Sequence, residues 1–186
     1  MIRIQLRESN LKKVLDALES VLSYVFMIAA PTETVYGLMT LYDNEAGRDR
    51  ICRLKGRDFS KPLQVLAADW RDAVSATEEI VQTVEGSVGV RVPDHGFLLH
   101  AIGRVGCPFA ATSANRSGEP PALTASDAVA GLTGRPDLLV DAGPVTGGVA
   151  STVVRLDSGC LEILREGPVD VERLRSCIAR DGSERN

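Results

Sequence analysis

Apolar side chains along the chain follow two periods, that of a helix and that of a buried strand. Leu11, Leu15 and Leu18 recur at helical spacing after Ser9 and Asn10, which can cap a helix. The apolar run 25–30 is typical of a buried strand. The same patterns predict further helices over 44–56, 76–84, 96–102, 124–132 and 170–178. They predict further strands over 62–67, 88–92, 108–112, 138–141, 152–156 and 161–164.

The alternation of helices and strands predicts an α/β fold in which helices pack on a sheet. The last two strands are joined by 157–160, a sequence that suits a hairpin turn, so we expect a mixed rather than a purely parallel sheet. We find no internal repeat and no low-complexity linker. We therefore expect a single domain over 1–186, with frayed residues at 181–186.

The composition is that of a soluble globular protein, with 44% hydrophobic and 25% charged residues. The formal net charge of −4 argues against a general attraction to nucleic acid or to an anionic membrane, but it leaves room for a local basic cleft. No apolar run approaches the roughly 20 residues that span a bilayer. The first ten residues lack the apolar core of a signal peptide. We expect a cytoplasmic protein.

The four cysteines form no CxxC pair, and the chain has only two histidines. We therefore expect neither a zinc site nor, in a reducing compartment, a disulfide. We expect the four thiols to be buried and inert.

A polar stretch, Pro-Thr-Glu-Thr-Val-Tyr-Gly-Leu at 31–38, follows the first buried strand. On strand spacing, Thr32 and Thr34 share one face, and Glu33 and Val35 lie on the other. Hydroxyl groups at a strand end can orient a polar substrate, since open α/β sheets bind ligands at the carboxyl ends of their strands. A turn whose hydroxyls satisfy only the turn itself explains the pattern equally well.

Cations and small polar residues follow two later elements. Lys55, Arg57 and Lys61 could bind the phosphates of a nucleotide, but their spacing alone favours a solvated basic helix end. Ser113 and Asn115 could cradle an anion with exposed backbone N–H groups, but alone they fit a plain turn better.

Arg91 follows an apolar strand and needs an anionic partner if that strand is central, because an unpaired buried charge is very costly. A ligand carboxylate or phosphate could serve, and so could Asp94 or another acid. Arg165 poses the same question. We expect His95 and His100 at the surface or at helix ends rather than in catalysis.

Taken together and in order, these motifs resemble the YrdC/TsaC family of threonylcarbamoyl-AMP synthases. The resemblance runs from about residue 25 to 170. Its pieces are PTETVYGL from Pro31, Lys55-Gly56-Arg57, SKPL from Ser60, RVPDH from Arg91, TSANRSGEPP from Thr112, STVV from Ser151 and ILREG from Ile163.

The resemblance implies a twisted mixed sheet around a positively charged cavity. It implies that L-threonine, bicarbonate or CO2 and ATP give threonylcarbamoyl-AMP and pyrophosphate, with Mg2+ accompanying the phosphates. A partner complex would then transfer the threonylcarbamoyl group to tRNA. The resemblance leaves weak RNA binding by this chain open.

The resemblance also implies roles for individual residues. Lys55 and Arg57 would be catalytic. ATP would be held by Arg57, Lys61, Ser87, Ser113, Asn115 and Arg165. Threonine would be held by Thr34, Arg91 and Ser151, with Arg91 on its carboxylate.

The chain departs from the family pattern before the RVPDH motif. A Trp-Pro-Gly-Pro-Leu-Thr stretch and a following strand are missing, and only twenty residues separate Trp70 from Arg91. Leu66 stands where many relatives carry a histidine, and Ala150 replaces a glutamate. The missing block favours an alternative function, that of a catalytically weak paralogue that binds RNA or a nucleotide, whereas the intact set of cations and hydroxyls favours the synthase. The related domain of hydrogenase-maturation carbamoyltransferases is a less favoured alternative, because the chain lacks their additional domains.

Overall fold

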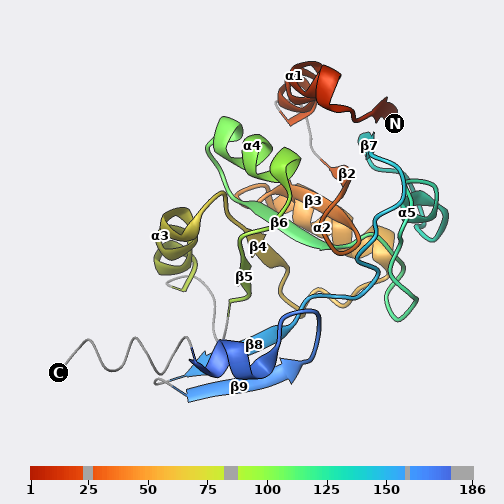
Figure 1. Cartoon of the computed structure of the whole chain (residues 1–186). Coiled ribbons are helices and arrows are strands. Elements are labelled where there is room, and N and C mark those ends of the chain that lie inside the picture. Colours follow the sequence, from red (N-terminus) through yellow and green to blue (C-terminus); the bar gives the residue numbers. More distant parts are fainter. Residues whose placement is uncertain (23–26, 82–87, 158–159, 177–186) are drawn as a thin grey trace. The chain divides into compact units, whose positions relative to one another are not determined.

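The computed structural model describes residues 1–22, 27–81, 88–157 and 160–176 (Figure 1). Contacts divide the chain into two compact units, Met1–Thr146 and Gly147–Asn186. Our expectation that the whole chain forms a single domain remains a prediction.

The first unit is built on a seven-stranded sheet with the strand order β1-β7-β2-β3-β6-β4-β5. The sheet is mixed, as predicted, although the hairpin from which we expected this forms a two-stranded sheet of its own. Strands β1, β7 and β2 are parallel, and so are β4 and β5, whereas β3 and β6 run antiparallel to their neighbours. The strands are β1 (Ile2–Gln5), β2 (Ile28–Pro31), β3 (Tyr36–Leu41), β4 (Gln64–Leu66), β5 (Val90–Arg91), β6 (Phe109–Ser113) and β7 (Leu138–Asp141).

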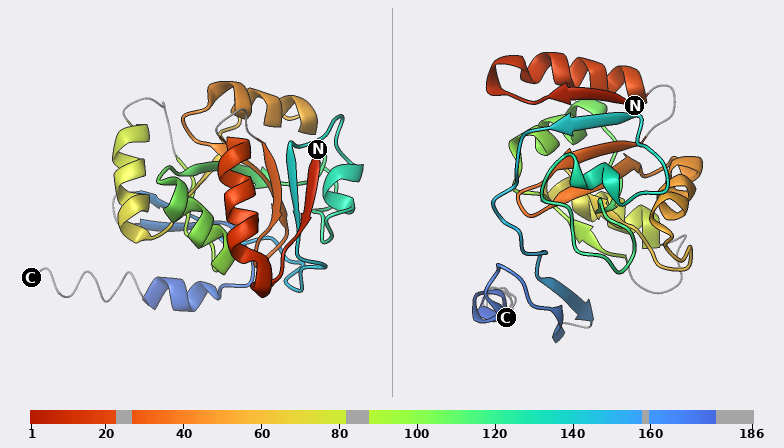
Figure 2. Two further views of the ribbon diagram at one scale, coloured as in Figure 1. Left: turned by 90° about the horizontal axis from the view of Figure 1, so that it is seen from above. Right: turned by 90° about the vertical axis from the view of Figure 1, so that its right-hand side faces the viewer.

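Helices cover both faces of this sheet. The helices are α1 (Leu11–Leu22), preceded by a 3₁₀ turn η1 (Glu8–Asn10), α2 (Glu45–Lys55), α3 (Trp70–Val81), α4 (Gly96–Val105) and α5 (Asp127–Ala130). Helices α1 and α4 lie side by side on one face (Figure 2). Helices α2 and α5 pack on the opposite face.

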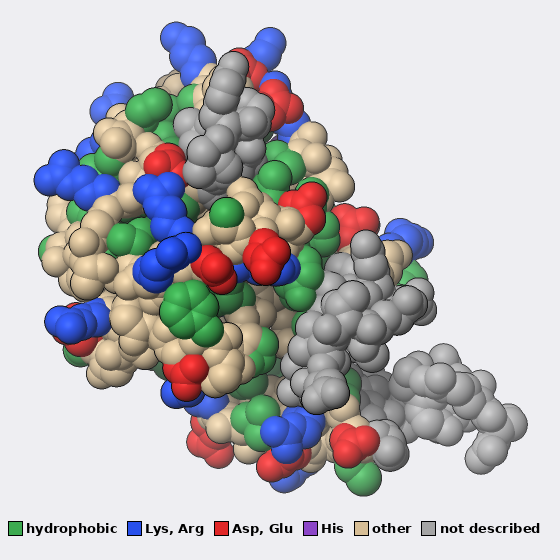
Figure 3. All heavy atoms as spheres, turned by 180° about the vertical axis from the view of Figure 1, so that it is seen from behind, with side chains coloured by type: hydrophobic (Ala, Val, Ile, Leu, Met, Phe, Trp, Pro, Cys, Tyr) green, Lys and Arg blue, Asp and Glu red, His purple; other side chains and the backbone are tan. Residues whose placement is uncertain are grey.

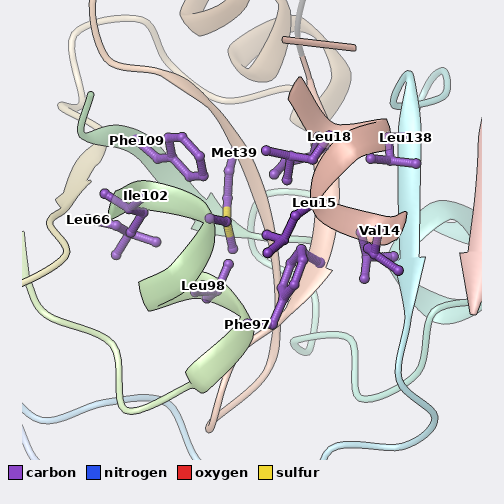
Figure 4. Close-up of a cluster of buried hydrophobic side chains, with 14 of the residues drawn as sticks. Val14, Leu15, Leu18, Met39, Leu66, Phe97, Leu98, Ile102, Phe109 and Leu138 are labelled. Carbon is purple, nitrogen blue, oxygen red and sulfur yellow. The ribbon is translucent and has the colours of Figure 1, made fainter. Parts of the chain in front are cut away.

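Successive strand residues point into two different hydrophobic clusters. Met39 and Leu138 join the cluster under α1 and α4, where Leu18 and Leu98 point toward them (Figure 4). Leu38, which precedes Met39, and Leu139, which follows Leu138, join the cluster under α2 and α5. A strand buried on both faces favours a continuous apolar run rather than an alternating one. Strand β7 shows such a run in its first three residues, whereas β3 is interrupted by Gly37 and Thr40.

Helix α2 has a defined start and end, and its end positions part of the candidate site. The Asn44 side chain accepts a hydrogen bond of 2.8 Å from the amide of Gly47. Gly56 follows the helix in the left-handed conformation, with φ of 59°. Gly56 ends the helix, so Lys55 lies on the last helical turn and Arg57 lies in the segment that follows.

The second unit contains the predicted hairpin, in which β8 (Val153–Asp157) pairs antiparallel with β9 (Cys160–Arg165). Residues 171–176 are helical, and the Asp170 carboxylate accepts hydrogen bonds from the amides of Glu172 and Arg173 at 2.7 and 3.1 Å. The expected capping role of Asp170 is therefore present. The predicted end of this helix and the frayed terminus lie outside the described residues.

Several elements differ from the sequence-based expectation. Strands β1 and β3 were not predicted, and β3 begins inside the polar stretch 31–38. Helix α3 starts at Trp70 rather than at residue 76, because the Asp69 side chain accepts bonds from the amides of Arg71 and Asp72 at 2.7 and 2.9 Å. Helix α5 spans only four residues, far fewer than 124–132.

The cysteines also differ from one another. Cys52 is buried and Cys107 is half-buried, but Cys160 is exposed, so the expectation of four buried thiols is wrong for Cys160. It lies on a two-stranded hairpin, which leaves a face of each strand exposed. Cys177 lies outside the described residues.

No helix in the described part of the chain is long and apolar enough to cross a membrane. On the face that Figure 3 shows, Lys and Arg side chains are interspersed with Asp and Glu side chains.

Candidate functional site

The polar turn between β2 and β3 is held together by the hydroxyl of Thr32. Its Oγ1 donates to the carbonyl of Val35 at 2.8 Å and accepts from the amides of Thr34 and Val35 at 3.0 and 3.1 Å. It also lies 2.9 Å from the hydroxyl oxygen of Thr34. The Thr32 hydroxyl is therefore used within the turn. For Thr32, this agrees with the interpretation that the hydroxyls of this stretch satisfy only the turn itself.

Arg91 at the end of β5 contacts two residues of this turn. Its guanidinium forms an ion pair with the Glu33 carboxylate and donates to the Thr34 hydroxyl at 3.1 Å. Glu33 and Thr34 were expected on opposite faces. That expectation is wrong because residues 32–35 form a turn rather than a strand.

The anionic partner that Arg91 needs is thus Glu33, not Asp94. The Arg91 side chain is 16% exposed and that of Glu33 is 30% exposed. At this burial, removal of one partner would leave the other charge poorly compensated. The pair therefore fixes the guanidinium next to the Thr34 hydroxyl.

The register of the sheet brings a second polar turn to the same edge. Gly37 of β3 pairs with Ser113 of β6, and the amide of Ala114 donates to the carbonyl of Tyr36 at 2.7 Å. The turns 32–35 and 113–115 are consequently neighbours, although they are far apart in the sequence.

Lys55 joins the end of α2 to the second turn. Its ammonium group donates to the carbonyls of Ser113 and of Asn115, the latter at 2.6 Å. The amide of Ser117 donates to the Lys55 carbonyl at 2.9 Å. Only 2% of Lys55 is exposed, so the interpretation as a solvated helix end does not hold for this residue.

The surroundings of Lys55 make its charge costly. Burial is the main cause that lowers the pKa of Lys55 to about 8, and the nearby charge of Arg57 adds to it. The two carbonyl oxygens favour the protonated form. Burial of the protonated Lys55 is thus unfavourable. The carbonyl groups of Ser113 and Asn115, on either side of Ala114, hold the cation in place.

Arg57 and Asn115 each keep a buried polar atom without a partner among the described residues. Arg57 donates to the carbonyl of Pro62 at 3.0 Å, while its Nε has no acceptor. The amide group of Asn115 donates to the carbonyls of Arg116 and Glu119 at 2.9 and 2.7 Å, while its Oδ1 has no donor. Buried polar atoms of this kind are usually paired, so both are available to a ligand.

The remaining candidate residues are placed differently. Lys61 is exposed. In the second unit, Arg165 donates to the carbonyl of Ser151 from Nε and from one terminal nitrogen, at 3.1 and 2.9 Å. These two residues therefore lie together. Ser87 lies outside the described residues.

The acidic side chains of the described residues do not offer a cage for a divalent cation. No group of three or more His, Cys, Asp or Glu side chains that could hold a metal ion occurs in the ranges 1–22, 27–81, 88–157 and 160–176. The residues in these ranges therefore do not fit a dedicated Mg2+ site, so we derive no step through the ion. A separate cavity lined by Asp72, Ser75, Ile102 and Cys107, among others, contains none of the candidate residues.

Two residues outside the expected set carry a buried polar atom that has no partner among the described residues, Oε2 of Glu33 and Nδ1 of His95. Glu33 was assigned to the far face of a strand, although its position between Thr32 and Thr34 is a signal that could have drawn attention to it. His95 precedes α4 and is half-buried, with Nδ1 buried and without a partner among the described residues. Its place in the sequence, four residues after Arg91, gives no sign of this burial.

Comparison with known proteins places this geometry in a family. The model of the Sua5/YciO/YrdC family, described as "Telomere recombination", matches residues 26–85 and 73–167. A threonylcarbamoyl-AMP synthase of Bacillus subtilis is 32% identical over 182 residues, which cover 82% of this chain and 53% of the relative. A Mycobacterium tuberculosis protein, provisionally named as the same synthase, is 28% identical and covers 84% of this chain and 85% of its own length.

A solved structure extends the likeness to three dimensions. The crystal structure of Pyrococcus abyssi Sua5 complexed with L-threonine has a TM-score of 0.77 and 26% identity. The match covers 94% of this chain and 59% of that protein. The chain thus spans little more than half the length of the Bacillus and Pyrococcus proteins. Since the two overlapping matches to the family model together cover residues 26–167, the chain belongs to the Sua5/YciO/YrdC family.

Proposed function

We propose that the protein is an L-threonylcarbamoyladenylate synthase, a nucleotidyltransferase. It would make threonylcarbamoyl-AMP and pyrophosphate from L-threonine, bicarbonate or CO2, and ATP. The observation that carries the proposal is the contact of the Arg91 guanidinium with the Thr34 hydroxyl, beside a second turn that Lys55 binds. The synthase names of the relatives and the L-threonine complex of Sua5 support it.

In this proposal, Arg91 and Thr34 bind L-threonine. The Arg91 guanidinium pairs with the substrate carboxylate, and the Thr34 hydroxyl orients the rest of the molecule. Ser151 of the second unit is proposed as a third threonine contact. Because Glu33 already holds Arg91, the guanidinium is fixed before the substrate arrives, which reduces the entropy lost on binding.

ATP is proposed to bind the cations and the 113–115 turn. The oxygen of an N-carboxylated threonine attacks the α-phosphorus of ATP, and pyrophosphate leaves. Negative charge gathers in one place during this step, so catalysis needs positioned cations more than an acid–base pair. We assign Arg57 and Lys55 to catalysis. ATP contacts are assigned to Arg57, Lys61, Ser87, Ser113, Asn115 and Arg165.

The wider setting follows from the product. A threonylcarbamoyl-adenylate is an activated acyl donor, so we propose that a tRNA-modifying threonylcarbamoyl transferase complex in the cytoplasm consumes it. Mg2+ is proposed to enter with the ATP phosphates rather than through a protein site.

The test is pyrophosphate release from ATP by the purified full chain with Mg2+ and bicarbonate, with and without L-threonine. Threonine-dependent release is the expected result. Arg57→Ala should reduce turnover by orders of magnitude. Arg53→Ala is the matched control, because Arg53 lies on the same helix end and is largely exposed. Equal turnover of the Arg57→Ala and Arg53→Ala proteins would refute the phosphate role.

A second candidate function is a catalytically weak paralogue that binds RNA or a nucleotide. The family model matches in two segments that overlap over 73–85, which fits a shortened connection before Arg91. This alternative predicts no pyrophosphate release. It also predicts RNA affinity that falls steeply with salt, because binding through phosphates releases counterions.

A further inference from the structure

One nitrogen of the Arg91 guanidinium serves two acceptors at once. Its Nη2 donates to the Glu33 carboxylate and to the Thr34 hydroxyl, the latter at 3.1 Å. A terminal nitrogen of arginine carries two hydrogens, and an N–H group donates best to one well-aligned acceptor. Glu33 and Thr34 therefore take one Nη2 hydrogen each.

This arrangement limits how a carboxylate can bind to Arg91. A carboxylate accepts two parallel N–H bonds from a guanidinium either along its Nε–Nη2 edge or along its Nη1–Nη2 edge. Both edges include Nη2, so neither has two free hydrogens while Glu33 and Thr34 are in place. A ligand that pairs with Arg91 through both carboxylate oxygens must displace one of these two residues.

Of the two, Thr34 is easier to displace. Its hydroxyl is neutral and lies 2.9 Å from the Thr32 hydroxyl oxygen, which remains a partner when Arg91 is lost. Glu33 carries a full charge, and Arg91 is its ion-pair partner among the described residues. The other oxygen of Glu33, Oε2, is buried and has no partner there. Removal of a partly buried carboxylate from its cation is costly, so Glu33 keeps its hydrogen.

The charge of Glu33 then restricts the kind of ligand. A second carboxylate on the same guanidinium places two negative charges beside one positive charge. The side chains of Arg91 and Glu33 are 16% and 30% exposed, so water screens this repulsion only in part. An α-amino acid carries an ammonium group next to its carboxylate, and this positive charge restores the balance. A simple carboxylic acid does not.

We propose that Glu33 selects an α-amino acid over other carboxylates at Arg91. The carboxylate of the amino acid takes the Nη2 hydrogen that Thr34 accepts in the free protein, and Glu33 keeps the other one. Glu33 is thus a positioning residue that also determines specificity, and the Thr34 hydroxyl becomes available to the rest of the ligand. That the amino acid is L-threonine rests on the proposed function.

Calorimetry on the full chain without ATP tests the selection. The two ligands are L-threonine and 3-hydroxybutanoate, which is threonine without its amine. The wild type should bind L-threonine more tightly. Glu33→Gln keeps the side-chain volume but removes the charge. It should weaken L-threonine binding and strengthen 3-hydroxybutanoate binding by about 3–10-fold each, the effect of one partly screened charge a few ångströms away.

Two further variants separate this selection from a structural role. Glu33→Asp keeps the charge and should keep the preference for L-threonine. Glu45→Gln removes an exposed carboxylate from the first turn of α2 and should match the wild type. Equal weakening of both ligands by Glu33→Gln would show that Glu33 only holds Arg91, and it would overturn the proposal.

Crystal structures of the full chain with and without L-threonine test the exchange at Nη2. Glu33 should contact Arg91 in both, and the Thr34 hydroxyl should contact it only without the ligand. Departure of Glu33 on binding would overturn the proposal. A ligand preference that depends on Glu33, without pyrophosphate release from ATP, would support this inference and refute the proposed function. Threonine-dependent release by a wild type that binds both ligands equally would do the reverse.

Discussion

Replacement of Lys55 by Met should change how the free energy of unfolding depends on pH. Lys55 is 2% exposed, and burial lowers its pKa to about 8 from 10.5. Below pH 8 the group is protonated in both states, and the folded protein bears the cost of a buried cation. Between about pH 8 and 10.5 the folded state loses this proton and the unfolded state keeps it. The unfolded state then binds more protons, so stability rises with pH.

The size of the effect follows from the two pKa values. A pKa difference of about 2.5 corresponds to about 3 kcal/mol. Relative to Lys55→Met, the wild type should gain about 1 kcal/mol between pH 7 and 9, and nearly the full amount by about pH 10.5. The other titrating groups are shared by both proteins and largely cancel in this difference.

Urea unfolding followed by circular dichroism, at constant ionic strength from pH 7 to 10.5, measures this difference. Lys61→Met is the control, because Lys61 is exposed in the same stretch of chain and its curve should run parallel to that of the wild type. Parallel curves for Lys55→Met and the wild type would show that Lys55 keeps its usual pKa. The argument from burial would then be wrong.

Three further predictions concern other parts of the protein. Arg91→Ala should weaken L-threonine binding by about 10–100-fold, because a charge-assisted hydrogen bond contributes about 1.5–3 kcal/mol; calorimetry that finds an unchanged affinity would refute this. Leu98→Ala should lower the free energy of unfolding by about 2–5 kcal/mol, since Leu98 is fully buried under the sheet, and denaturant unfolding measures it. Gly167→Ala should disrupt the second unit, because a Cβ there would lie 2.3 Å from the amide nitrogen of Thr152; proteolysis that cleaves this variant no faster than the wild type would contradict the prediction.

The main-chain pattern could be predicted where the apolar signal was clear. The run 138–141 is apolar except for Asp141 and forms β7, and Asn44 caps α2 as expected. Strand β3 could not be found in this way, because its residues are buried on both faces and include Gly37 and Thr40. Its first residues also belong to a stretch that resembles a turn.

The side-chain partners in the candidate site were harder to predict. The need of Arg91 for an anion followed from its strand, but the choice of Glu33 depends on a contact between residues 58 positions apart. Likewise, Lys55 looked like a solvated helix end, since the two carbonyls that bind it come from a turn nearly sixty residues later. Such contacts depend on the register of β3 and β6, which the sequence alone does not give.

The place of β7 in the sheet has a consequence for how the chain folds during synthesis. Strands β1 and β2 are close in the sequence but are separated in the sheet by β7, which pairs with both. When only the first hundred residues have emerged from the ribosome, β7 has not yet been made, so β1 has no strand to pair with. Contacts of such long sequence separation form slowly. The N-terminal strand should be among the last parts of the sheet to dock, and until then its edge and that of β2 are open to pairing with other chains.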